Sequence, residues 1–137
     1  MILTDSSAWI EYLRGTGSEI NVRVRAHHEL IGELAVTEVV AMELYAGVRN
    51  PREEQRVRQL VQGVPLLTTN GLEDYEHAAS LFRACRRSGE TVRKLVDCLI
   101  AAVAIRNDVP VLHHDADFDV LARHTPLRVA SRDGPLA

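Results

Sequence analysis

The chain has 137 residues, of which 46% are hydrophobic and 26% charged, with two cysteines and a formal net charge of −3. This length and composition predict one globular domain, and they exclude a disulfide-stapled scaffold, a cysteine-based zinc fold and a membrane-spanning protein. The opening segment has no basic region and Asp5 interrupts its apolar stretch. We therefore expect no signal peptide and place the protein in the reducing cytosol.

Short apolar runs alternate with longer helical patterns along the chain. In chain order we predict a strand at 1–4, helices at 7–14 and 19–29, a strand at 34–36, helices at 37–46 and 51–62, a strand at 64–67, helices at 72–88 and 94–107, a strand at 109–112, a short helix ending near 122, and an edge strand at 127–129. This alternation predicts an α/β fold with a parallel sheet of four to five strands and helices on both faces. We assign residues 1–130 to this domain and 131–137 to a loose C-terminal tail.

The run 95–105 is apolar except for Asp97, which predicts a buried helix carrying a single acid. A buried carboxylate is costly unless it is paired or holds a metal. In open α/β sheets, ligands bind beyond the carboxyl ends of the strands, where acids that follow strands converge. We therefore expect one shared cation between Asp97 and four further acids in apolar settings: Asp5, Glu43, Asp115 and Asp117.

These acids also have structural interpretations. Asp5 is suited to cap the first helix, and Asp97 to sit in a first helical turn where the macrodipole favours it. Asp115, Asp117 and Asp119 are typical of turns and caps. Capping does not explain Glu43 or Asp97, whose neighbours are apolar on every side.

Four motifs in order carry a family resemblance. They are ILTDSSAW at 2–9, ELYAG at 43–47, DCLIAA at 97–102 and DADF at 115–118. The chain resembles the PIN-domain ribonucleases, and among them the VapC-type toxins of toxin–antitoxin pairs, from residue 1 to about 129. It departs from the family pattern at His113 and His114, where a threonine and a basic residue are common, and whether either histidine contacts substrate stays open.

The residue types suit phosphodiester hydrolysis. A hard divalent cation held by carboxylates can activate water, neutralise the phosphate and stabilise the leaving oxygen. We expect Mg²⁺ or Mn²⁺ on Asp5, Asp97 and Asp115, with Glu43 and Asp117 completing the catalytic ring. Ser7 is expected to support the site through a hydrogen bond to a carboxylate or phosphate, or to act only as a cap.

The resemblance implies an endoribonuclease toxin that cleaves structured RNA, often transfer RNA, leaving a 5′-phosphate and a 3′-hydroxyl. It also implies a toxin homodimer and inhibition by a cognate VapB-type antitoxin bound in a groove near the acids. Two alternatives remain open. One is an acid-phosphatase-like hydrolase that uses Asp115 and Asp117, and the other is a receiver-like binding domain without catalysis.

Several other side chains allow both a functional and a purely structural interpretation. Trp9, Tyr12 and Leu13 on the first helix are expected to line the antitoxin groove, unless Trp9 belongs to the core. Two groups of arginines either line an RNA path or cover solvated helix faces; they are Arg49, Arg52 and Arg56, and Arg83, Arg86, Arg87 and Arg93. Four histidines are expected at the solvated surface, namely His27, His28, His77 and His124.

Overall fold

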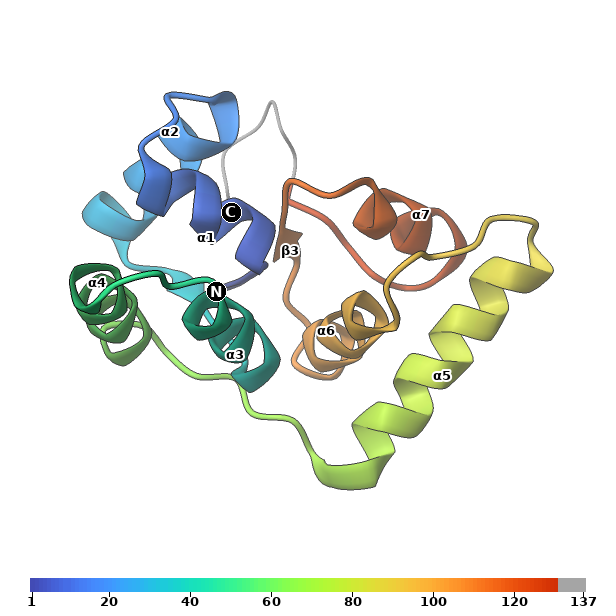
Figure 1. Ribbon diagram of the computed structural model, residues 1–137. Helices are drawn as coiled ribbons and strands as arrows, with labels where there is room; N and C mark the ends of the chain where they lie inside the picture. Colours follow the sequence, from blue (N-terminus) through green and yellow to red (C-terminus); the bar gives the residue numbers. More distant parts are fainter. Residues whose placement is uncertain (131–137) are drawn as a thin grey trace.

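The computed structural model describes residues 1–130, apart from the side chains of residues 30 and 31, so the predicted tail at 131–137 lies outside the described residues. Strands and helices alternate as predicted (Figure 1). The elements in chain order are β1 (Ile2–Thr4), α1 (Ser6–Arg14), α2 (Glu19–Ala26), a π-helical turn η1 (His27–Ile31), β2 (Leu34–Ala35), α3 (Glu38–Ala46), α4 (Pro51–Gln62), α5 (Gly71–Arg87), α6 (Leu95–Arg106), β3 (Val111–Leu112) and α7 (Ala116–His124).

The sheet is parallel, with strand order β2-β1-β3. The central strand β1 pairs Ile2 with Leu34 on one side and Leu3 with Val111 on the other. All three residues of β1 are buried, as expected for a parallel strand covered on both faces. The carboxyl ends of β1 and β3 therefore lie side by side, which is the edge where we expected the acids to meet.

The described residues form three strands rather than four to five. The segment predicted at 64–67 contributes one parallel bridge, Val36 with Leu66, and the segment predicted at 127–129 contributes another, Val111 with Val129. Each segment contains or follows a proline, at positions 65 and 126, which cannot donate a ladder hydrogen bond. The two predicted edge strands are thus single contact points at the two edges of the sheet.

Helices lie on both sides of the strands. Figure 1 shows α1 and α2 on one side and α3 and α6 on the other, with α5 packed along the outside of α6. Every residue of α6 from Asp97 to Ala104 is buried, which confirms the prediction of a buried helix from an apolar run with no polar face. This burial fixes the position of Asp97 relative to the sheet.

Local sequence signals set most helix ends. Pro51 occupies the first turn of α4 and the Asn50 side chain accepts a hydrogen bond from Glu53 N, so this helix has its predicted bounds. Gly15 ends α1 in the left-handed conformation with φ of 59°. The helix predicted at 19–29 instead ends at Ala26 and continues as the π-helical turn, which stops at Gly32.

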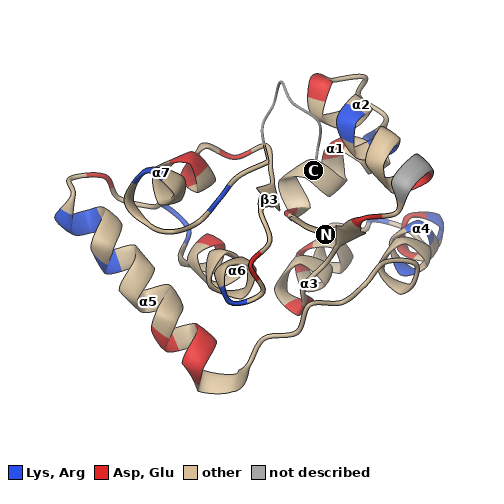
Figure 2. Ribbon diagram, turned by 180° about the vertical axis from the view of Figure 1, so that it is seen from behind, with Lys and Arg blue, Asp and Glu red and all other residues tan. Residues whose placement is uncertain are grey.

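The longest helix, α5, separates its charges along its length. Its first turn carries Glu73 and Asp74 and its last turn Arg86 and Arg87, which is the arrangement that the helix dipole favours (Figure 2). No helix in the described part of the chain is long and apolar enough to cross a membrane.

Candidate active site

The predicted acids lie where strands end and helices begin. Asp5 follows β1 and caps α1, and Asp115 follows β3 and caps α7. Asp97 and Asp117 stand in the first turns of α6 and α7. The N-terminal ends of three helices carry these four carboxylates, and the positive ends of their macrodipoles favour negative charge there.

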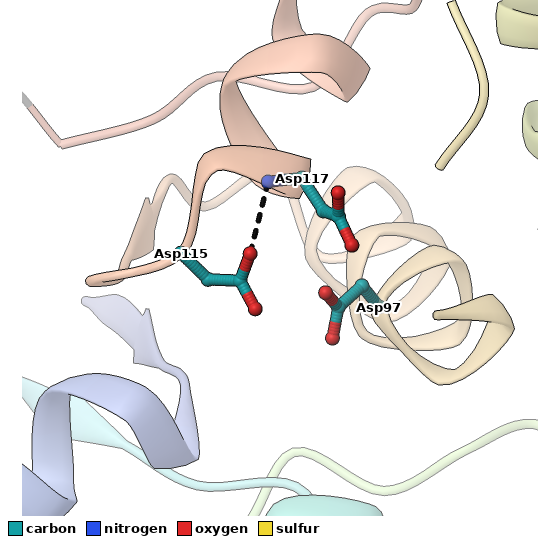
Figure 3. A group of neighbouring side chains, drawn as sticks. All are labelled: Asp97, Asp115 and Asp117. Carbon is teal, nitrogen blue, oxygen red and sulfur yellow. Dashed lines mark hydrogen bonds between the residues drawn. The ribbon is translucent and has the colours of Figure 1, made fainter. Parts of the chain in front are cut away.

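Three of the acids form a compact group. Asp97, Asp115 and Asp117 each place one carboxylate oxygen within 4.8 Å of the other two, and Figure 3 shows their side chains pointing toward one another. Asp117 N donates a 3.0 Å hydrogen bond to Asp115 Oδ1, which fixes the loop between β3 and α7. This group contains Asp117, which we had placed in the supporting ring, and does not contain Asp5, which we had placed among the metal ligands.

Asp5 and Glu43 each accept hydrogen bonds from one of two adjacent serines at the start of α1. Ser7 donates from its backbone N and from its Oγ to Asp5 Oδ2, and Ser6 Oγ donates to Glu43 Oε1 at 3.2 Å. Ser7 Oγ also accepts a 2.9 Å hydrogen bond from His114 N, so it connects Asp5 to the β3–α7 loop. Asp5 is the N-cap of α1, so Ser7 does not have the capping role that the sequence left open; its hydroxyl donates to a site carboxylate, which was the other expectation.

Burial and mutual repulsion make these carboxyls hard to ionise. Burial raises the pKa of Asp97 to about 8, and the charge of Asp5 adds to the shift. Burial also raises the pKa of Asp5, and burial together with the Asp5 charge raises the pKa of Glu43. Asp5 Oδ1 and Asp97 Oδ2 are buried without a hydrogen-bond partner among the described residues. The fold thus concentrates negative charge here and leaves it undercompensated.

Two basic residues that sequence reasoning did not assign to the site contact these acids. Lys94 Nζ lies 2.5 Å from Asp115 Oδ2 and 4.0 Å from Asp97 Oδ2. Arg93 Nε lies 3.3 Å from Asp117 Oδ1. Burial alone would raise the pKa of Asp115, but the Lys94 and backbone hydrogen bonds hold it below its usual value. The available signal was the i, i+3 spacing of Lys94 and Asp97, which places them on one helical face.

His113 and His114 take different places around the loop. His113 is buried, its Nδ1 accepts a 3.1 Å hydrogen bond from Asp115 N, and its Nε2 lies 3.3 Å from Asp119 Oδ1. Since Nδ1 is the acceptor, Nε2 carries the proton. His114 is exposed, and its Nε2 lies 3.8 Å from Glu11 Oε1. His113 therefore positions Asp115.

The donor set fits a hard divalent cation. All of its converging ligand atoms are carboxylate oxygens, which Mg²⁺ and Mn²⁺ prefer, and no thiol or imidazole of the described residues joins the compact group. The buried oxygens of Asp5 and Asp97 that lack a partner in the described structure are the second indication, because such groups are normally satisfied. The arrangement can bind a divalent cation, and the pKa of Asp97, raised to about 8, brings the protonation of this one carboxyl close to neutral pH.

The three residues predicted to line the antitoxin groove do not all lie at one surface of the structure. Trp9 is fully buried, with its ring against Tyr12 and His28, so it belongs to the core and the groove assignment for it was wrong. Leu13 lines a groove of about 350 Å³ between α1, α3 and α4, which Glu43 also lines. Tyr12 lines a neighbouring hollow that Leu13 and Arg56 share.

The surface prediction also fails for His27 and His28. His27 is 7% exposed, and burial lowers its pKa. His28 is half-buried, packs edge-on against Trp9 and Tyr12, and has its pKa lowered by burial as well. The π-helical turn brings both histidines inward, a deviation from the helical period that the sequence pattern did not reveal.

Comparison with known proteins agrees with the geometry. A family model described as PIN domain matches residues 2–124. A curated VapC ribonuclease of Mycobacterium bovis and ribonuclease VapC11 of Mycobacterium tuberculosis are each 47% identical over 132 residues, which cover 96% of this chain and 98% of theirs. The chain belongs to the VapC-type PIN-domain ribonuclease toxins. This membership supports nuclease chemistry over the phosphatase and receiver alternatives.

Solved structures of other VapC-type and related complexes share the fold. VapBC-1 from nontypeable Haemophilus influenzae superposes with a TM-score of 0.72 at 18% identity, covering 98% of this chain and all of that one. FitAB bound to a DNA fragment gives 0.74 at 19%, covering 94% and 93%. VapC20 from Mycobacterium tuberculosis gives 0.65 at 15%, covering 93% and 99%. These similarities show that the PIN fold is retained at low sequence identity.

Proposed function

We propose that this VapC-type protein is a Mg²⁺- or Mn²⁺-dependent endoribonuclease that cleaves structured RNA, with transfer RNA as the first candidate, and leaves a 5′-phosphate and a 3′-hydroxyl. The observation that carries the proposal is the group of Asp97, Asp115 and Asp117, whose oxygens lie within 4.8 Å of one another. Burial, together with the Asp5 charge, raises the pKa of Asp97 to about 8, and a bound cation would stabilise the ionised form.

Asp97, Asp115 and Asp117 would hold the cation, with Asp5 and Glu43 beside them. Bound there, a divalent cation supplies charge neutralisation at the phosphate, a more acidic water and stabilisation of the leaving oxygen. Glu43 is half-buried, and burial together with the Asp5 charge raises its pKa, which favours a role as a proton acceptor. Arg93, with a side chain that is 73% exposed, can turn from Asp117 to a phosphate of the RNA.

The RNA target is proposed from family membership and from surface charge. One structural neighbour, VapC20, is described as a toxin that cleaves the sarcin–ricin loop. Exposed arginines of this chain lie at the C-terminal end of α5 and next to the acids, at Arg86, Arg87 and Arg93. Such a basic surface suits a folded RNA whose backbone spans several phosphates.

Inhibition by a VapB-type antitoxin is proposed at the groove between α1, α3 and α4. The structural neighbours include VapBC complexes. Leu13, Leu44 and Val57 give this groove an apolar lining, while Glu43 connects it to the acids. An antitoxin segment that buries apolar side chains here and extends a basic side chain toward Glu43 and Asp5 would oppose metal binding.

The cellular location is proposed from the cysteines. Because the two buried cysteines form no disulfide, we place this activity in the reducing cytosol.

A toxin homodimer is proposed through the exposed apolar side chains of α3, α5 and α6. Met42, Leu72, Tyr75 and Leu95 are each more than half exposed. Leu72 and Tyr75 lie three positions apart near the start of α5 and so share one face, and exposed large apolar side chains mark interaction surfaces. Replacing Leu72 by Asp should shift the protein toward monomer in analytical ultracentrifugation, while replacement of the exposed Arg58 should not.

Cleavage assays test the main proposal. Purified protein should cut transfer RNA or ribosomal RNA with Mg²⁺ or Mn²⁺, stop in EDTA and resume when Mg²⁺ is restored, whereas Ca²⁺, which tolerates looser geometry, should not restore it. Asp115→Asn should lower the rate at least about 100-fold, as loss of groups that orient charge at an active site does. Asp108→Asn is the matched control, because Asp108 pairs with Arg128 at the surface and is in a left-handed conformation that Asn tolerates. Undiminished cleavage in excess chelator would contradict the proposal.

A further inference from the structure

Lys94 is the only lysine of the chain, and it reaches the acids from the N-terminal end of α6. Its Nζ donates to Asp115 Oδ2 at 2.5 Å and lies 4.0 Å from Asp97 Oδ2. The Lys94 charge also lowers the pKa of Asp5 and of Glu43 against the larger effect of their burial. One ammonium group therefore acts on four of the five acids.

The attachment of this ammonium group is loose. Among the described residues Lys94 makes one hydrogen bond and one long ion pair, and its side chain is 52% exposed. A lysine ammonium is a point charge on a flexible stem, and the solvent on its exposed side lets it leave this position at small cost. By contrast, Arg106 holds buried Asp74 through three hydrogen bonds of 3.0 to 3.2 Å.

The ammonium group of Lys94 also lies beside the acids proposed to hold the cation. Asp97 Oδ2 and Asp115 Oδ2 both face Nζ, and both belong to the acids whose oxygens form the compact group. Two ionised carboxylates this close together repel one another. A positive charge between them relieves this repulsion, and an ammonium group and a divalent cation cannot both occupy the space between the same oxygens.

We propose that Lys94 is a tethered cation that occupies the acidic group in the metal-free protein and moves into solvent when a divalent metal binds. This inference rests on the proposed metal site. Lys94 thereby stabilises the metal-free fold and weakens metal binding, so it sets the metal concentration at which the nuclease becomes active. The role belongs to this one side chain and is independent of which RNA is cleaved.

The decisive experiment uses the fact that there is a single lysine. Full-length protein carrying ¹³C-lysine gives one set of side-chain signals, and NMR relaxation measures the order of the Lys94 Cε group. Without metal the group should be ordered by its contacts with Asp115 and Asp97. Saturating Mg²⁺ should lower the order to the value found in metal-free Asp115→Asn, in which the hydrogen bond to the ammonium group is weakened. An order that stays unchanged while Mg²⁺ binds would overturn the proposal.

The variant Lys94→Met gives a second, independent readout. It should melt at a lower temperature than the wild type without metal, and it should bind Mn²⁺ about fivefold more tightly by calorimetry, the size expected for loss of one exposed ion pair. If Lys94 has no role beyond surface charge, Lys94→Met changes neither the melting temperature nor the Mn²⁺ affinity. If Lys94 instead helps to hold the metal site in place, Lys94→Met binds Mn²⁺ more weakly. Either result contradicts the proposal.

Calorimetry on the wild type separates this inference from the proposed function. If wild-type protein binds neither Mg²⁺ nor Mn²⁺ in the millimolar range, the metal site itself is wrong. If the wild type binds metal and Lys94→Met binds it no more tightly, the metal site stands and the role of Lys94 falls.

Discussion

Asp74 on α5 and Asp97 on α6 are equally buried, at 2% exposure each, on two helices that pack against one another, yet their surroundings are opposite. Asp74 accepts three hydrogen bonds from Arg106 and one of 2.7 Å from Asn70 N. Burial alone would raise the pKa of Asp74, but these hydrogen bonds hold it below the usual value. Asp97 has a pKa raised to about 8 and an oxygen without a hydrogen bond in the described structure.

We propose that this difference reflects the different roles of the two carboxylates. Where a buried acid serves only the fold, the chain surrounds it with fixed donors, because an unpaired buried charge is destabilising. Asp97, which we propose to serve chemistry, has a buried oxygen without such a donor in the described structure, and the fold carries the cost. Burial therefore does not distinguish Asp74 from Asp97, whereas the hydrogen-bond donors around the two carboxylates do.

We expect the largest change in stability from a substitution of Asp74. Asp74→Asn should lower the free energy of unfolding by about 2–3 kcal/mol, because it leaves Arg106 without its counter-charge; the loss is below that of a fully buried pair since Arg106 is partly exposed. Urea denaturation monitored by circular dichroism measures it. A loss below 0.5 kcal/mol, on the order of a surface substitution, would mean that Asp74 and Arg106 do not hold α5 to its neighbours.

Replacing Asp97 by asparagine should change the free energy of unfolding in the opposite direction. Asp97→Asn, studied without metal, should raise the free energy of unfolding by about 1–2 kcal/mol, because it removes a carboxyl that is poorly compensated beside Asp5 and Asp115. It should also abolish RNA cleavage. If Asp97→Asn unfolds the protein, Asp97 is a structural partner like Asp74 and the contrast fails.

The free energy of unfolding should also depend on pH. The Asp97 pKa lies at about 8 in the folded state against 3.8 for the ordinary group. Between these values the folded metal-free protein binds more protons than the unfolded chain, so its free energy of unfolding falls as pH rises. The difference in stability between Asp97→Asn and the wild type should therefore grow from pH 5 to pH 8.

Asp74 supplies the control for this pH series. Its pKa is lowered, so its stabilising contribution is complete above the ordinary pKa of 3.8 and is lost only as pH falls through the lower folded value. The difference between Asp74→Asn and the wild type should stay constant from pH 5 to pH 8. Comparing variants with the wild type at each pH also removes the contributions of His27 and His28, whose lowered pKa values act in the same range.

The sequence predicted the parts of the fold that depend on local pattern. The helix at 51–62 has strong boundary signals, Asn50 and Pro51, and its predicted bounds match the structure. The buried helix around Asp97 was predicted because its whole circumference is apolar. The π-helical turn deviates from the helical period in a way that no local pattern revealed. At the sheet edges a local signal was present, because Pro65 and Pro126 disfavour the two predicted edge strands. The acids were identified by their apolar neighbours, which is a local property as well.

The partners of these acids were not predictable in the same way. Arg106 lies 32 positions after Asp74, and Lys94 lies 21 positions before Asp115, so both contacts depend on the completed fold. Trp9 was misassigned because a helix with many apolar residues does not reveal which of them face the core. Its complete burial against Tyr12 and His28 follows from the inward π-helical turn.

The most direct test of the central claim is the free energy of unfolding of the wild type and of Asp97→Asn as a function of Mn²⁺ concentration. Without metal, Asp97→Asn should be the more stable protein. Metal that binds only the folded state stabilises it by about 2.7 kcal/mol at 100 times its dissociation constant, so the wild type should overtake the variant as Mn²⁺ rises. Two curves that rise in parallel would show that Asp97 takes no part in metal binding and would contradict the account.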